Sequence, residues 1–275
     1  MNVTLPGEPF DGSSEPVPPA GSPAQVGLES PPSFPAWGLA DLARILVVLL
    51  LVLFFSDTSA VLIANMLPAP PGTTAQRFAS DPRVVVPAQA VAYLLTVWFI
   101  VRMIRRHYRL KFFTAVHWRF PRRWLVMLAG GLLLALAVQI LSISLPIPKQ
   151  LPIEQYFSSP LGAWLMAGFG IVVAPFCEEL FFRGLLFPVL RQRLGMLAAL
   201  VLTSGLFAII HASQLGRSWA AVSVLFVVGV VLTLVRAKTD SLASSVLVHS
   251  GYNLALFTLV YLSTSGFHDF KALTQ

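Results

Sequence analysis

Long runs of apolar residues, broken only by short polar segments, dominate the chain from about residue 39 onward. Two of these runs, residues 218–235 and 242–266, contain no Asp, Glu, Lys or Arg, and as helices each is long enough to cross a bilayer. The pattern therefore predicts an all-α, polytopic helical membrane protein with about seven transmembrane helices, within a range of six to eight. The expected spans are residues 39–66, 84–104, 124–145, 161–186, 197–212, 219–235 and 242–262.

Composition agrees with a membrane protein and suggests how the chain is divided. Hydrophobic residues make up 56% and charged residues 11%, about half the charged fraction of a soluble domain, so a water-soluble fold is excluded. The first 36 residues differ, with nine prolines and no Lys or Arg, and predict a disordered tail. We expect four parts: this tail (1–36), N-terminal transmembrane helices with a basic cytoplasmic loop (37–123), a membrane domain (124–266) and a C-terminal tail (267–275).

Basic residues are distributed unevenly between the loops. The segments 102–123, 183–193 and 236–238 carry thirteen Lys and Arg, whereas the loops on the other side carry five. Because Lys and Arg are retained in the cytoplasm, this asymmetry predicts a cytoplasmic N-terminus, seven crossings and a C-terminus on the opposite side. The net charge of +7 is thus explained by topology, without a nucleic-acid partner. Tryptophans near predicted span ends are expected at the membrane interface: Trp37, Trp124, Trp164 and Trp219.

Charged residues occur within or beside the fourth span. Glu178, Glu179 and Arg183 stand among apolar residues, where charges cost at least a few kcal/mol each unless they are paired or hydrated. On a helix, Glu179 and Arg183 are i,i+4 neighbours and can form an ion pair, while Glu178 points about 100° away. One carboxylate is then left for chemistry. The alternative is a cluster that caps the inner end of the span.

Two further polar clusters lie in later spans. His211 follows Phe207 by one helical turn, and His249 precedes Asn253 by one turn, so that His249 and Asn253 project from one face. A single membrane histidine is often an interhelical hydrogen bonder. With Glu178, however, the three clusters supply a base, a partner group and an oxyanion site, the parts of a water-activating hydrolase.

In this order, Glu178-Glu179-x-x-x-Arg183, Phe207-x-x-x-His211 and His249-x-x-x-Asn253 resemble the three motifs of the CPBP intramembrane proteases. This group includes type II CAAX prenyl endopeptidases and bacteriocin-processing or bacteriocin-immunity proteins. The resemblance covers residues 161–262 and implies an endopeptidase with a conical catalytic cavity in the helix bundle. It also implies that Glu178 and His211 activate water, that His249 and Asn253 stabilise the oxyanion, and that Glu179 and Arg183 orient these groups.

The sequence leaves metal dependence, substrate and function class open. We expect no required cofactor, although zinc could be held by Glu178, His211 and His249, as the name metalloprotease for such families suggests. The expected partners are a membrane-associated peptide or protein and the lipid bilayer, in a bacterial inner membrane. A non-catalytic scaffold or immunity partner on the same fold and a proton-coupled transporter are the alternatives. The single cysteine, Cys177, excludes an internal disulfide.

The apolar windows raise one geometric difficulty. They place Glu178 near the inner end of the fourth span and His211 near the outer end of the fifth. The two side chains can meet only if the fourth helix continues to about Leu190 and the fifth begins after a loop around Gly195. In addition, the basic segment 102–123 is expected to lie on anionic lipid, and Asp57 in the first span has no assigned role.

Overall fold

The structure is a computed structural model that describes residues 1–3, 34–66, 81–148, 152 and 159–269. The chain divides into two units, Met1–Pro32 and Ser33–Gln275, and every helix belongs to the second. Most of the predicted N-terminal tail and of the predicted C-terminal tail lies outside the described residues. The same holds for the side chain of Asp57.

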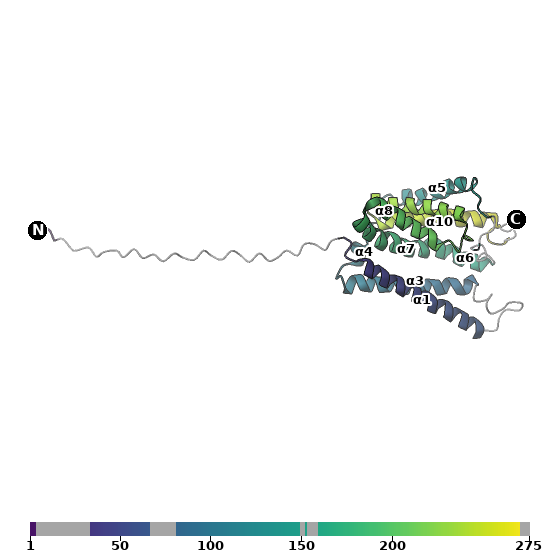
Figure 1. The fold of residues 1–275 in the computed structure, drawn as a ribbon, viewed down its shortest axis with the longest axis horizontal. Coiled ribbons are helices and arrows are strands. Elements are labelled where there is room, and N and C mark those ends of the chain that lie inside the picture. Colours follow the sequence, from purple (N-terminus) through teal and green to yellow (C-terminus); the bar gives the residue numbers. More distant parts are fainter. Residues whose placement is uncertain (4–33, 67–80, 149–151, 153–158, 270–275) are drawn as a thin grey trace. The chain divides into compact units, whose positions relative to one another are not determined.

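Helices make up the second unit, and the described residues contain no β-strand (Figure 1). Six helices in the described part are long and apolar enough to cross a membrane, which confirms the prediction of an all-α polytopic membrane protein. In chain order the elements are α1 (Leu39–Met66), α3 (Pro82–Arg106), α4 (Phe112–Ala115), α5 (Trp124–Ser142), α6 (Pro160–Gly168), η2 (Phe169–Val173), α7 (Ala174–Glu179), η3 (Leu180–Leu186), α8 (Phe187–Ile210), α9 (Trp219–Thr239) and α10 (Leu242–Ser263).

The helical stretch Pro160–Ile210 contains both the fourth and the fifth predicted spans. It does not run straight, because Gly195 adopts φ 80° and ψ 175° within α8, a conformation that glycine reaches without steric cost. A straight helix would separate Glu178 from His211 by about 50 Å. Instead, Phe182 and Phe207 stack with ring centroids 5.4 Å apart, so the chain doubles back at Gly195. The long fourth helix and the break at Gly195 were both expected, and the fourth and fifth predicted spans form the two arms of this one stretch.

Helices α5 and α10 lie side by side, and glycines set their separation (Figure 1). A Cβ on Gly131 would come within 2.1 Å of the Val248 carbonyl oxygen, and a Cβ on Gly251 within 2.2 Å of the Leu128 carbonyl oxygen. Any larger residue at either position would therefore push the helices apart. Since Gly251 lies between His249 and Asn253, this close contact fixes the part of α10 that carries both motif residues.

Two segments, η2 and η3, are π-helical turns inside the long helical stretch. Such turns displace backbone hydrogen-bond partners and are frequent at functional sites. In both segments a distant side chain donates to a carbonyl: Asn253 Nδ2 to Gly170 O (2.7 Å) in η2, and Trp37 Nε1 to Leu185 O (3.0 Å) in η3. The π-helical turns are thus anchored from outside the helix that contains them.

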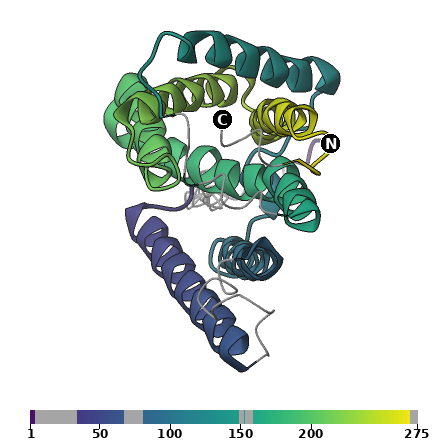
Figure 2. The same ribbon diagram turned by 90° about the vertical axis from the view of Figure 1, so that its right-hand side faces the viewer.

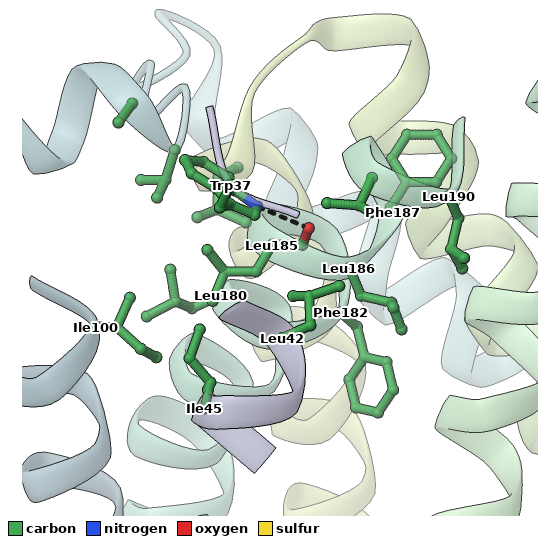
Figure 3. Packing of buried hydrophobic residues seen from close by; sticks show 14 of the residues in the cluster. Trp37, Leu42, Ile45, Ile100, Leu180, Phe182, Leu185, Leu186, Phe187 and Leu190 are labelled. Carbon is green, nitrogen blue, oxygen red and sulfur yellow. Dashed lines mark hydrogen bonds between the residues drawn. The ribbon is translucent and has the colours of Figure 1, made fainter. Parts of the chain in front are cut away.

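The largest apolar core surrounds η3 and includes Trp37, which comes from just before α1 (Figure 3). Trp37 is 2% exposed, and its indole N–H donates to Leu185 O as Figure 3 shows. The prediction that Trp37 lies at the membrane interface is therefore wrong: the core covers its ring, and a backbone carbonyl satisfies its only polar group. Trp124, Trp164 and Trp219 are exposed.

Candidate active site

The residues of the three sequence motifs lie on α7, η3 and α10 and at the C-terminal end of α8, and their side chains meet in one cluster. Glu179 and Arg183 are both completely buried, and Arg183 Nη1 donates to Glu179 Oε1 over 2.7 Å, which is the ion pair expected from their spacing. The remaining guanidinium donors reach α9: Nη2 donates to Gly229 O at 2.9 Å and Nε to Thr233 Oγ1 at 3.3 Å. Every nitrogen of this buried cation is thereby hydrogen-bonded, as a charge in such a position requires.

The Glu179 carboxylate also joins α7 to α10. Its Oε1 accepts from His249 Nδ1 at 3.0 Å, and its Oε2 accepts a short hydrogen bond from the Ser245 hydroxyl. Because the carboxylate of an ion pair accepts, the proton of His249 must lie on Nδ1, and Nε2 is turned away from Glu179. Glu179 is fully occupied by these partners, so its role is to hold other side chains in place.

The second carboxylate, Glu178, faces two imidazoles instead. Its Oε2 lies 3.8 Å from His211 Nε2 and 3.9 Å from His249 Nε2. These separations exceed a direct hydrogen bond but suit groups that share an intervening water molecule or proton. The side chain of Glu178 is 15% exposed and that of His211 17%, whereas Glu179 and Arg183 are inaccessible. Glu178 is thus the site carboxylate that remains accessible and available for chemistry.

His211 is oriented by the helix that ends beside it. Its Nδ1 donates to Phe207 O at 2.7 Å, which leaves Nε2 facing Glu178, and its ring packs against Phe207 at 4.9 Å between centroids. Phe207 also stacks on His249 at 5.8 Å and lies 4.6 Å from the Arg183 guanidinium. The expected bracing of His211 by Phe207 is present, and the Phe207 ring contacts both imidazoles and the buried cation.

Asn253 lies one turn beyond His249 on α10, as its spacing predicted. One N–H of its amide donates to Gly170 O in η2, so the side chain links α10 to the helix that carries Glu178. The amide has a second N–H on the same nitrogen. Its predicted role as an oxyanion donor stays a prediction.

Sequence reasoning missed the side chains that complete the buried network. Ser245 binds Glu179, Thr233 accepts from Arg183, and the Gly229 carbonyl accepts a second guanidinium bond. A Cβ on Gly229 would lie 3.1 Å from the Cα of Ser204, so α9 approaches α8 closely at this point. Ser and Thr within an apolar span were a visible signal, but their partners lie too far away in sequence to identify.

A metal centre would need shorter separations than this cluster has. Ligands of a tetrahedral zinc ion lie about 2.0–2.2 Å from the metal, so their donor atoms are about 3.3 Å apart. The Glu178 oxygen is farther than that from both imidazoles, and the described residues contain no group of three His, Cys, Asp or Glu side chains placed to bind a metal.

The fold and the cluster define a polytopic helical membrane protein with glutamate and histidine side chains grouped as hydrolases use them. Residues 160–255 match the family described as type II CAAX prenyl endopeptidase, Rce1-like. The chain therefore carries an Rce1-like domain over residues 160–255, which confirms the resemblance found in the sequence. All seven residues named in the three motifs lie within the match, whereas α1, α3 and α5 lie outside it. No curated protein and no solved structure matches the chain.

Proposed function

We propose that the protein is an intramembrane endopeptidase that hydrolyses a peptide bond of a membrane-associated, prenylated or leader-containing substrate by means of water activated by Glu178. The observation that carries this proposal is the difference between the surroundings of two adjacent carboxylates. Glu179 is saturated by Arg183, Ser245 and His249, while Glu178 faces two imidazole nitrogens across gaps of 3.8 and 3.9 Å. A free carboxylate beside imidazoles, with restricted access to water, is suited to general-base chemistry.

In the proposed reaction, a water molecule lies between Glu178 and His211. Glu178 accepts a proton from the water as its oxygen attacks the carbonyl carbon of the scissile bond, and the carbonyl oxygen becomes an oxyanion. The carbon–nitrogen bond then breaks, and the proton held by Glu178 passes to the leaving amine. The products are a carboxylic acid and an amine, so the atoms of water are fully used.

The orientation of His249 supports a role beside the oxyanion. Since its Nδ1 proton is donated to Glu179, its Nε2 donates to an oxyanion only when the ring carries a second proton. Asn253 is the second proposed donor, through the N–H that Gly170 does not use. Arg183 acts indirectly, by keeping Glu179 charged and in place.

Zinc is the alternative means of activating water. Glu178, His211 and His249 would be its ligands after a small closure of their side chains, and the ion would supply a Lewis acid for the bound water. The proposal does not require it. Elemental analysis of active, purified protein tests this point: stoichiometric zinc whose removal stops turnover reversibly would replace the metal-free form of the proposal and leave the peptidase assignment standing.

Exchange of Glu178 for glutamine tests the function. Membranes from cells that produce wild type or Glu178→Gln are compared by peptide proteomics, with Asp81→Asn as the matched acid-to-amide control. Asp81 caps α3 outside the site, and asparagine caps helices equally well. We expect at least one cleaved peptide to disappear in Glu178→Gln alone, with insertion unchanged. Cleavage at a substantial fraction of wild type would contradict the proposal, and a complete absence of cleavage products in wild type would favour a scaffold.

The helices indicate that the protein is embedded in a membrane, and the identity of that membrane is part of the proposal. Six apolar helices in the described residues and the Rce1-like domain make this an integral membrane protein. We infer a bacterial inner membrane, whose cytoplasmic leaflet would face the basic loops.

A further inference from the structure

Helices α1 and α3 lie side by side, and the opposite side of α3 packs on α6 and η2 (Figure 2). Two adjoining grooves follow their surface. The first, of about 340 Å³, is lined among others by Arg44, Trp98, Arg102, Arg106 and His107. The second is shallow and open, and one face of α3 alone forms it, with Val91, Leu94, Leu95 and Trp98. Because Trp98 lines both, a basic groove continues into an apolar one along α3.

The grooves lie on the face of α3 that points away from the candidate active site. Val91, Leu95, Trp98 and Arg102 are spaced by three and four residues, so they share one side of the helix, and all four are exposed. Tyr93 lies on the other side and stacks on Phe169 of η2 at 5.6 Å. A substrate bound in these grooves would thus be separated from Glu178 by α3 itself.

Positive charge is concentrated at one end. The Arg102 guanidinium lies 5.5 Å from the centre of the Trp98 ring, a cation–π contact that leaves its N–H donors available. Arg44 is paired with Asp41, whereas Arg102 and Arg106 form no ion pair within the described residues. Two guanidinium groups are therefore available to an anion, with an apolar strip directly beside them.

We propose that this surface is a binding site for an anionic phospholipid, whose phosphate contacts Arg102 and Arg106 and whose acyl chain lies along Val91, Leu94, Leu95 and Trp98. Guanidinium groups match the geometry of phosphate oxygens, and an aromatic ring at the boundary is favoured between headgroup and acyl chain. The basic end of α3 belongs to the side that carries most of the Lys and Arg, where anionic headgroups are found. The site lies outside the Rce1-like match and does not depend on the proposed protease activity.

Native mass spectrometry of the purified full-length protein in detergent tests the proposal. Dioleoyl phosphatidylglycerol is titrated into wild type, Arg102→Gln/Arg106→Gln and the control Arg122→Gln/Arg123→Gln, which removes two exposed arginines from the same basic loop. We expect one tightly bound lipid in wild type and in the control, with affinity roughly 30-fold weaker in Arg102→Gln/Arg106→Gln, since each arginine near an anionic lipid contributes a factor of about five. Phosphatidylcholine should bind weakly to all three.

Two further experiments distinguish a lipid site from its alternatives. Trp98→Ala should weaken phosphatidylglycerol binding while the exposed Trp124→Ala does not, and inorganic phosphate should fail to displace the lipid. Equal losses in the two double-arginine variants would mean diffuse surface charge and overturn the proposal. Displacement of the lipid by inorganic phosphate would overturn it in favour of a simple anion site. Displacement by a farnesylated peptide with a free carboxylate, but not by its methyl ester, would overturn it in favour of a substrate site.

Discussion

Glu179 and His249 are joined by a hydrogen bond between residues 70 positions apart, with His249 Nδ1 and Glu179 Oε1 separated by 3.0 Å. This contact sets the tautomer of the imidazole and turns its Nε2 toward Glu178. Thus the buried carboxylate of Glu179 orients the histidine that faces the neighbouring carboxylate.

Ser245 should act as a positioning residue through this contact. Ser245→Ala removes the hydroxyl that donates to Glu179 Oε2, and we expect a fall in kcat of roughly tenfold, because one neutral-to-charged hydrogen bond contributes about 1.5–3 kcal/mol. KM should change little, and Ser245→Thr should restore most of the activity. Ser223→Ala, at an exposed serine of α9, is the control. Equal losses of folded protein and of activity would indicate a purely structural role.

Asn253 distinguishes oxyanion stabilisation from helix bridging. If its second N–H meets the oxyanion, Asn253→Ala should lower kcat by roughly 10²–10³ with little change in KM. If its only function is the bond to Gly170 O, the variant should instead unfold at a lower temperature and keep its kcat per folded molecule. We expect the first result. Steady-state kinetics and the melting temperature, measured on one preparation, decide between them.

The buried ion pair predicts an asymmetric mutational response. Arg183→Met leaves Glu179 without its cation and should destabilise the fold by about 3–5 kcal/mol. The double variant Glu179→Gln/Arg183→Met removes both charges and should regain much of that loss, although not the activity. Thermal unfolding in detergent measures both. If the double variant were as unstable as Arg183→Met, charge burial would not be the reason for the defect.

Stability should depend on pH through Asp240, which connects α9 and α10. Burial by itself raises the pKa of Asp240, but hydrogen bonds from Arg236 and His117 outweigh it, so the pKa lies below its usual value. A lowered pKa in the folded state stabilises the protein above the unfolded pKa of about 3.9, and this contribution disappears as the pH falls through the folded value. Asp240→Asn, which tolerates the same left-handed backbone (φ 47°), should melt below wild type at pH 7. The difference should shrink as the pH falls below the unfolded pKa and vanish below the folded pKa, and a pH-independent difference would contradict the assignment.

Topology remains a prediction of the charge asymmetry. Reporter fusions after Arg123 and after Arg193 should report the cytoplasm, and fusions at Lys271 the opposite side, because thirteen basic residues lie on one side and five on the other. Fusions before residue 36 provide the cytoplasmic reference. A cytoplasmic C-terminus would show that one of the seven passes, such as the short arm after Gly195, does not cross.

The amino-acid sequence is sufficient to identify the class of fold and the residues of the candidate site. Apolar runs of bilayer length can be satisfied only by helices, so the sequence predicts most of their limits to within a few residues, although two of the seven predicted spans belong to one helical stretch, Pro160–Ile210. Charged and imidazole side chains in such runs are costly unless functional, and this cost alone singles out Glu178, Glu179, Arg183, His211 and His249. The i,i+4 spacing also predicts the Glu179–Arg183 pair correctly, because a helix makes those two residues neighbours.

The division of roles among these residues depends instead on contacts between helices. Whether Glu178 or Glu179 meets His211 depends on the chain reversal at Gly195. It also depends on the approach of α9 and α10, whose residues form hydrogen bonds to partners 46 and 70 positions away in the sequence. Ser245 and Trp37 illustrate the same limit: each is an ordinary residue in sequence, yet one binds the buried carboxylate and the other a carbonyl 148 positions away. Local spacing specifies neighbours on one helix. Contacts between helices depend on packing, which a single sequence does not encode in any short pattern.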